Sequence, residues 1–199
     1  ATVTLSGATD STFAGVVSGN LGIAKTGTAT QTLTGVNVFT GAVSVTGGTL
    51  AAGSNTALSG AAVTVDGGTL DLTATTGAGI ANLVTLTSGS LTGGSIALSQ
   101  VTLVAGTVST QLTGGATDGL TKSNNTTLTL SGANTFTDGV TVTAGTLAAM
   151  NNAKIPLAVA VSVVVFGESA DWVRLAISAT LLGLAVWLAE RSPRAIPKK

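Results

Sequence analysis

The sequence contains no cysteine, no histidine and no tyrosine, and these absences remove whole classes of chemistry. Without cysteine the chain has neither disulfides nor a thiolate nucleophile. Without cysteine and histidine it lacks the ligands of most zinc and copper sites, and without histidine it lacks the usual base near neutral pH. Charged residues make up only 8% of the 199 residues and aromatic residues 3%. Such a chain must gain its stability from regular backbone pairing and stacking, as repeat proteins do.

The few charges are unevenly distributed. Residues 1–149 hold two lysines and five aspartates, a net charge of −3, whereas residues 150–199 hold six positive and three negative residues, a net charge of +3. The first part has no basic patch and no aromatic platform, so nucleic acid is excluded as a partner. Composition therefore predicts two domains, residues 1–149 and residues 150–199.

The first part contains a long internal repeat. Residues 22–52 recur as residues 119–149 at a shift of 97, and the alignment needs no gap. The aligned pairs include Lys25 with Lys122, Asn37 with Asn134, and Phe39 with Phe136.

A shorter repeat of about twenty residues lies inside the long one. Triplets of glycine, a hydroxyl residue and an apolar residue recur at steps of 20, 21, 17 and 39, and each has an apolar residue five positions before its own. Hydroxyl residues flank these apolar positions, and alternation with period two is typical of short strands that bury one face. The predicted core residues are Leu33, Val45, Leu50, Val65, Leu70, Leu86, Leu91, Leu103, Leu130, Val142 and Leu147.

Each unit thus consists of a strand, a small-residue corner such as Gly47-Gly48, a second strand and a variable connection. Stacked units of this length, rich in threonine, valine and glycine, predict an all-β fold, a parallel β-solenoid of roughly seven turns. A β-sandwich is the alternative, because it also has short alternating strands with frequent turns.

Two segments resemble a known family. Residues 128–137, LTLSGANTFT, and residues 140–147, VTVTAGTL, are similar to the passenger-associated transport repeat of bacterial autotransporters, and residues 22–50 are a weaker copy. The resemblance implies an exported, right-handed β-helix passenger on the surface of a Gram-negative cell. It implies no catalytic residues, because the repeat is a structural element in that family. The chain shows no membrane β-barrel translocator pattern, which the family would lead one to expect.

The second part predicts a membrane anchor. Residues 172–189 form an apolar run of about 18 residues, which is about 27 Å as a helix and close to the ~30 Å hydrocarbon core. Indoles favour the membrane interface, and an arginine near a helix end can snorkel to it. The predicted anchor residues are Trp172, Arg174, Trp187, Arg191 and Arg194. By the positive-inside rule the basic tail is cytoplasmic, which places the solenoid outside.

The shorter apolar run, residues 155–167, is too short to span as a straight helix. We expect an interfacial helix or one buried in a complex; a final solenoid strand and the start of a longer helix are alternatives. Composition and charge change abruptly at Met150, the only methionine, so a fusion of two gene products is a further possibility.

The remaining polar residues favour structural roles. Asp66 and Asp71 are the only close carboxylate pair, and we expect solvated surface residues, not an acid–base pair or a calcium site. Lys25 and Lys122 are expected on a solvated edge of the coil. Asn37 and Asn134 are expected to hydrogen-bond at corners, with Phe39 and Phe136 covering the apolar interior.

These features predict a non-catalytic, membrane-anchored surface protein with a structural or adhesive role and no cofactor or metal. Its expected partners are the membrane and other proteins, including copies of itself. The alternative is an accessory subunit of a larger membrane complex with the β-rod as an extrinsic part. Ice binding by a threonine face is disfavoured, because Asp66 and Val104 interrupt the array.

Overall fold

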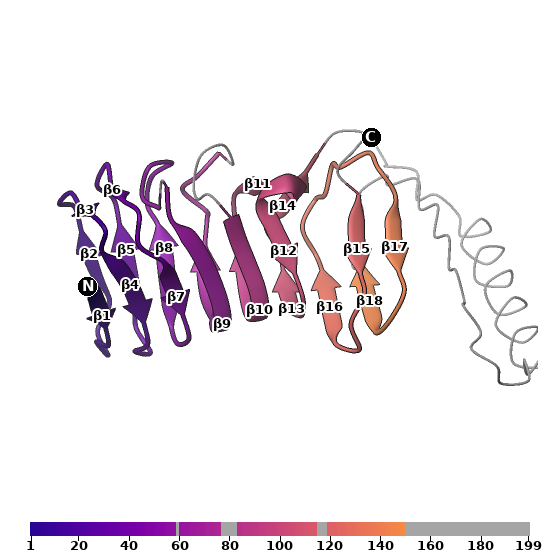
Figure 1. Cartoon of the computed structure of the whole chain (residues 1–199), viewed down its shortest axis with the longest axis horizontal. Helices are drawn as coiled ribbons and strands as arrows, with labels where there is room; N and C mark the ends of the chain where they lie inside the picture. The colour runs from indigo at the N-terminus through magenta and orange to yellow at the C-terminus, as the bar shows by residue number, and fades with distance from the viewer. Residues whose placement is uncertain (59, 77–82, 115–118, 150–199) are drawn as a thin grey trace, which may run out of the picture. The chain divides into compact units, whose positions relative to one another are not determined.

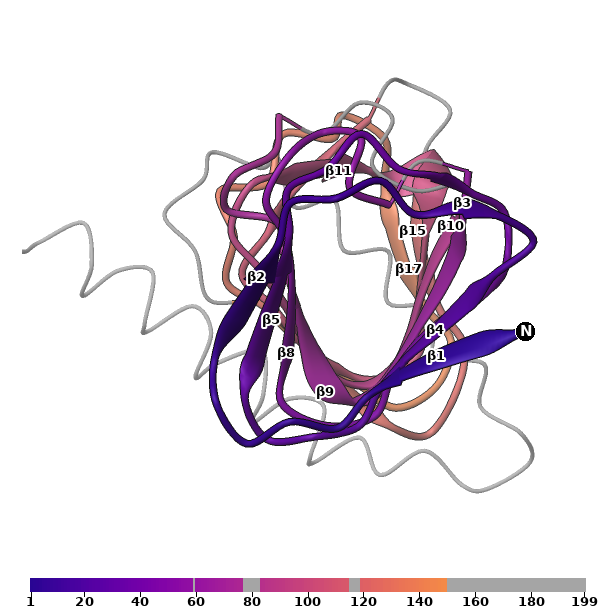
Figure 2. The same ribbon diagram turned by 90° about the vertical axis from the view of Figure 1, so that its left-hand side faces the viewer.

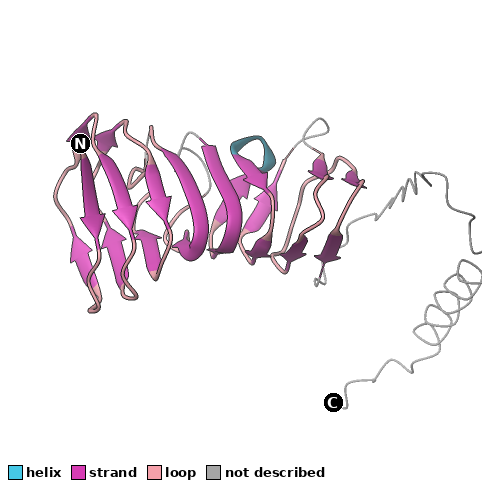
Figure 3. Ribbon diagram, turned by 60° about the horizontal axis from the view of Figure 1, so that its bottom comes forward, coloured by secondary structure: helices cyan, strands magenta, loops and turns pink. Residues whose placement is uncertain are grey.

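A computed structural model describes residues 1–58, 60–76, 83–114 and 119–149. These residues form a parallel β-solenoid, in which successive turns of about twenty residues stack along one axis (Figure 1). The strand pairs formed by the described residues are all parallel, which excludes the antiparallel sandwich. Among these residues the helical structure is a single 3-10 turn, Leu98–Gln100 (Figure 3).

Face 1 of the solenoid contains the strand before each corner. Its strands are β1 (Thr2–Leu5), β4 (Gly22–Lys25), β7 (Val43–Val45), the first half of β9 (Ala62–Asp71), the first half of β10 (Leu83–Thr92), β12 (Val101–Leu103), β15 (Leu120–Lys122) and β17 (Val140–Val142). The sequence step of about twenty residues places like residues in register. One inward column runs Val3, Ile23, Val43, Val63, Val84 and Val101.

Face 2 contains the strand after each corner. Its strands are β2 (Ser11–Phe13), β5 (Thr30–Leu33), β8 (Thr49–Ala52), the second halves of β9 and β10, β13 (Gly106–Val108), β16 (Thr127–Leu130) and β18 (Thr146–Ala149). Its inward column runs Leu50, Leu70, Leu91, Val108 and Leu130. The two halves of β9 and β10 show that a strand can bend through the corner without interruption.

Face 3 is less regular. It contains the pairs β3 (Ser18–Gly19) with β6 (Val38–Phe39), and β11 (Ser95–Ala97) with β14 (Gln111–Thr113). Figure 2 shows the turns superposed along the stack, with β2, β5 and β8 on one side and β1 and β4 on another. Side chains from the three faces fill the space between them.

The structure buries nine of the eleven predicted core residues: Leu33, Val45, Leu50, Val65, Leu70, Leu86, Leu91, Leu103 and Leu130. Val142 and Leu147 are half-buried. Both belong to the last described turn, which a described neighbour covers on one side only. Burial in this fold therefore depends on having a turn on each side.

The predicted transmembrane helix, residues 172–189, and the apolar run 155–167 lie outside the described residues, as does the predicted domain boundary at Met150. Within the part of the chain that is described, no helix has the length and apolar character needed to cross a bilayer.

Candidate functional site

The two neighbouring carboxylates, Asp66 and Asp71, have separate hydrogen-bond partners. Asp66 is exposed and accepts a hydrogen bond from Ser88 Oγ at 2.8 Å. Asp71 accepts bonds from the backbone N–H of Thr73 at 2.8 Å and from its hydroxyl at 2.6 Å. Each carboxylate thus has its own structural partner, and the described residues contain no group of three ligands suited to a metal ion.

Lys25 occupies an unexpected position inside the solenoid. It lies in the inward column of face 1, between Leu5 of the preceding turn and Val45 of the following turn, and it is only 2% exposed. Its ammonium group donates hydrogen bonds to the carbonyl of Gly27 and, at 3.2 Å, to the carbonyl of Gly47. One side chain therefore joins the corners of two successive turns.

The electrostatics of Lys25 follow from this burial. Removal from water lowers the pKa of the Lys25 ammonium group from its ordinary value of 10.5, and the negative charge of Asp10 opposes the change. Burying a charge is unfavourable unless it is paired or hydrogen-bonded, and here backbone carbonyls supply the partners. The ammonium group is thus held in place by its hydrogen bonds to the carbonyls of Gly27 and Gly47.

Lys122 occupies the equivalent position in the second copy and is 1% exposed. It donates hydrogen bonds to the carbonyl of Asn124 at 2.5 Å, to the side-chain oxygen of Asn124, and to the hydroxyl of Thr126 at 3.1 Å. The prediction of a solvated coil edge was thus wrong for both lysines. The corners that follow these lysines, 26–29 and 123–126, are each four residues long, and in each a backbone carbonyl accepts a hydrogen bond from the ammonium group.

A sequence signal for this placement exists. Lys25 precedes Val45 by twenty residues and Lys122 precedes Val142 by twenty, and both valines were predicted to face inward. The strict period of the stack therefore places both lysines in an inward column, although lysine is almost never fully buried.

Glycines complete the lysine corners. Gly48 has a φ of +57°, and a Cβ there would lie 2.7 Å from Lys25 Nζ and 2.6 Å from the carbonyl oxygen of Ala29. Gly145 has a φ of +77°, and a Cβ there would lie 3.0 Å from Lys122 Nζ. Only glycine fits both the backbone conformation and the close approach. The lysine and the glycine that follows it 23 residues later therefore form one structural unit, which is present in both copies.

The paired asparagines also join turns, as the sequence predicted for corner hydrogen bonds. Asn37 is 1% exposed; its oxygen accepts from the backbone N–H of Val17 and its amide donates to the carbonyl of Ala57, both at 2.8 Å. The oxygen of Asn134 accepts from the N–H of Leu112 at 2.9 Å. Each aromatic neighbour, Phe39 or Phe136, is buried in the core, as expected.

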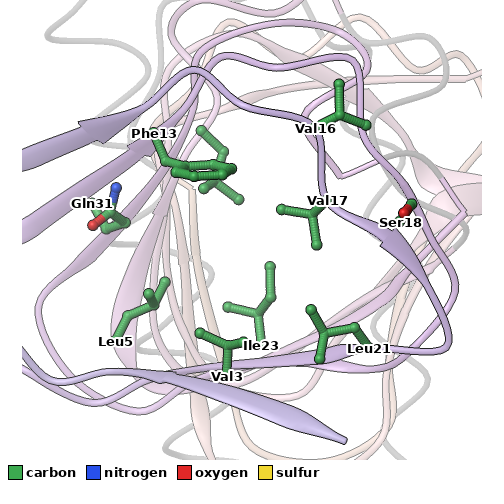
Figure 4. A pocket seen from close by; sticks show the side chains of 10 residues that line it. Val3, Leu5, Phe13, Val16, Val17, Ser18, Leu21, Ile23 and Gln31 are labelled. Atoms are coloured by element: carbon green, nitrogen blue, oxygen red, sulfur yellow. The ribbon is translucent and has the colours of Figure 1, made fainter.

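The first turn has an apolar opening at the end of the stack. A cavity of about 400 Å³ lies there, and Figure 4 shows Phe13 and Val17 directed into it. Val3 is 43% exposed and Phe13 45%, whereas their register partners one turn on, Ile23 and Leu33, are each 3% exposed. These side chains are exposed because the first turn has a described neighbour on one side only.

The outward face carries a column of hydroxyl residues. On face 1 the register aligns Thr4, Ala24, Ser44, Thr64, Thr85 and Thr102, and then Thr121 with Thr141, and each of these except Ala24 carries a hydroxyl. The surface is regular and polar but nearly uncharged.

Comparison with known proteins identifies the repeat. Residues 23–52 and residues 120–149 each match the passenger-associated-transport-repeat family, which agrees with the resemblance read from the sequence. The two matches include both lysine corners and both asparagine–phenylalanine pairs. No curated protein and no solved structure matches the chain.

Proposed function

We propose that this chain is a non-catalytic surface protein, a β-solenoid of the autotransporter-passenger kind that is displayed outside a bacterial cell. The observation that carries the proposal is the pair of passenger-associated transport repeats within one continuous parallel stack. That repeat belongs to exported passengers, and nothing in its lysine, glycine and asparagine pattern depends on bound cofactors.

The proposed mechanism is presentation. A stack of parallel turns is stabilised by contacts between neighbouring turns, so it can hold a long, regular surface without disulfides. The side chains that face outward are small and mostly hydroxylic, and few are charged. Such a surface is suited to a structural or adhesive role through hydrogen bonds spread over many turns.

We further propose that residues 172–189 anchor the chain in the membrane, with Trp172 and Trp187 at the interfaces and the tail holding Arg191 and Arg194 inside. The support is the length of the apolar run, the placement of the indoles and the basic tail. Arg174 would extend its guanidinium to the outer interface.

The test uses the full chain in a Gram-negative host, with a tag after Lys199. External protease should remove the solenoid from intact cells and leave a tagged fragment protected in the membrane fraction. Leu181→Arg should release the chain from the membrane, since an arginine at a helix centre costs about 3 kcal/mol on insertion. Ala195→Arg adds the same charge in the tail and should stay in the membrane.

Full protection of the solenoid on intact cells would overturn external display. Extraction in a fixed stoichiometric complex with other membrane proteins would instead favour the accessory-subunit alternative.

A further inference from the structure

Face 1 is interrupted at one place. Strands pair continuously from β1 to β12, and then β15 pairs with β17. Between β12 and β15 the described residues make no strand pairing, although these strands occupy successive turns (Figure 1). A cavity of about 270 Å³ lies between them, which we call the slot. Its lining includes Leu98, Val101, Thr102, Leu103, Leu120 and Thr121.

The other faces hold the two turns together across this gap. On face 2, β13 pairs with β16 in register from Gly106 with Leu128 to Val108 with Leu130. On face 3, the N–H of Thr135 donates to the carbonyl of Leu112 at 2.8 Å. At the corner the hydroxyl of Thr126 donates to the carbonyl of Val104 at 2.7 Å. The slot is therefore a one-sided opening with a closed end, bounded by fixed contacts.

The register tells which backbone groups face the slot. In an intact part of face 1, the N–H of Ile23 donates to Ala42 and the carbonyl of Lys25 accepts from Thr46, both in the next turn. Val101 and Leu103 are the register equivalents of Ile23 and Lys25. The N–H of Val101 donates to the carbonyl of Leu98 at the end of the 3-10 turn, so the groups of this wall that face the slot are the carbonyl of Val101 and the N–H and carbonyl of Leu103. On the opposite wall, Leu120 bonds toward β17, so the alternate residue Thr121 faces the slot.

The side chains of the two walls, β12 and β15, determine which side chains a bound strand should have. The inward residues at the slot are apolar on both walls, Leu103 at 7% exposure and Leu120 at 6%. The outward residues Thr102 and Thr121 are exposed hydroxyls. An occupant strand should therefore alternate apolar, hydroxyl and apolar residues, and β-strand addition recognises its partner by this combination of main-chain bonds and alternate side chains.

We propose that the slot binds an extended peptide segment of another protein as an added strand between β12 and β15. The segment has apolar residues on either side of a hydroxyl residue, and it bonds to both walls at once. The proposal goes beyond display at the surface and does not depend on where the chain is located.

The probe is a labelled, end-blocked peptide with the sequence of residues 138–143, Asp-Gly-Val-Thr-Val-Thr, because Val140–Val142 already pairs with the far edge of β15. Titration into the purified full chain, followed by fluorescence anisotropy, should give saturable binding with Kd of about 10⁻⁵ to 10⁻⁴ M for so short a strand.

Peptide N-methylation separates the slot from an ordinary sheet edge. Successive N–H groups of a strand point in opposite directions, so N-methylation of the peptide's threonine removes a donor to one wall, and N-methylation of the following valine removes a donor to the other. Binding between two walls predicts that each modification weakens binding by about tenfold, the equivalent of ~1.4 kcal/mol. If only one of the two N-methylated peptides binds more weakly, the peptide bonds to a single strand edge, and the proposal is overturned.

Protein variants locate the site. Thr121→Pro removes a backbone donor that faces the slot, whereas Thr4→Pro makes the same change on β1, the open edge at the start of the stack. We expect Thr121→Pro to weaken binding about tenfold and Thr4→Pro to leave it unchanged. The reverse pattern, or no saturable binding up to about 1 mM peptide, overturns the proposal. The N-methylated peptides use the unchanged protein, so the test does not depend on how well the proline variants fold.

Discussion

The two copies of the repeat, residues 22–52 and 119–149, place the same residues in different surroundings. In the first copy β4 pairs with strands on both sides, β1 and β7. In the second copy β15 pairs only with β17 among the described residues, and its other edge faces the slot. The sequence match between the copies thus extends to the pairing of the two turns inside each copy, β4 with β7 and β15 with β17, but not to the pairing with the preceding turn on face 1.

The lysines show the same difference. Lys25 joins its own corner to the next one through Gly27 and Gly47. Lys122 bonds to Asn124 and Thr126 within its own corner. The role shared by the two lysines is to donate hydrogen bonds to a carbonyl of their own corner, and the link to the next turn is an addition in the first copy. Equivalent substitutions, one in each copy, separate the contribution of bonding within a corner from that of the link between turns.

The largest effect is expected from the buried phenylalanines. Phe39→Ala should lower the free energy of unfolding by about 4 kcal/mol, because it leaves a cavity at a fully buried site. Phe136 is 4% exposed and lies near the last described turn, so Phe136→Ala should cost somewhat less, about 3 kcal/mol. Denaturant unfolding of the full chain measures both; equal losses would show that the two copies are equally well packed.

The corner glycines come next. Gly48→Ala should cost about 3 kcal/mol, since it combines a positive φ with close contacts to Lys25 Nζ and the Ala29 carbonyl. Gly145→Ala is expected to cost less, because its turn has a described neighbour on one side only. Gly19→Ala is the control: its φ is +80° but a Cβ there meets nothing within 4 Å, so only the backbone cost of about 1 kcal/mol remains. If Gly19→Ala and Gly48→Ala are equally destabilising, the close contacts are unimportant.

Replacement of the lysines tests the link between turns. Lys25→Met keeps most of the side-chain volume but leaves the carbonyls of Gly27 and Gly47 without this donor, and we expect a loss of about 2 kcal/mol. Lys122→Met should cost about 1 kcal/mol, since Asn124 and Thr126 lie at a corner that water can reach. Thermal unfolding followed by circular dichroism compares them. A larger loss for Lys122→Met would contradict the linking role of Lys25.

Periodicity predicted most of the fold, because a parallel stack puts residues one period apart in the same environment. Val45, Val65 and Leu86 were recognised as core residues by that rule alone, and they align in the structure. The same rule applied to lysine would have placed it inside, but hydrophobicity outweighed register in the prediction. A polar residue in an inward column is a specific signal that a corner needs a donor.

The slot was beyond sequence reasoning for a physical reason. Whether β12 pairs with β15 depends on the lengths of two different corners, Val104–Ala105 and residues 123–126, and on how the turns tilt to satisfy both. The local sequence pattern determines the structure of each turn, whereas the spacing between two turns depends on the sequences of both.

The smallest effect is expected from pH, and it concerns Lys25 alone. Burial lowers the pKa of Lys25 in the folded chain below 10.5, its ordinary value, while the unfolded chain keeps that value. Between the lowered pKa and 10.5 the unfolded state binds more protons, so stability rises with pH across that window. Wild type should therefore gain stability relative to Lys25→Met as the pH approaches 10.5 in denaturant titrations. Asp10→Asn removes the charge that raises the Lys25 pKa, so the window should begin at lower pH. A wild-type advantage that shrinks over this range would mean that the hydrogen bonds to Gly27 and Gly47 require the charged ammonium group, and that the link between turns outweighs the cost of burying the charge.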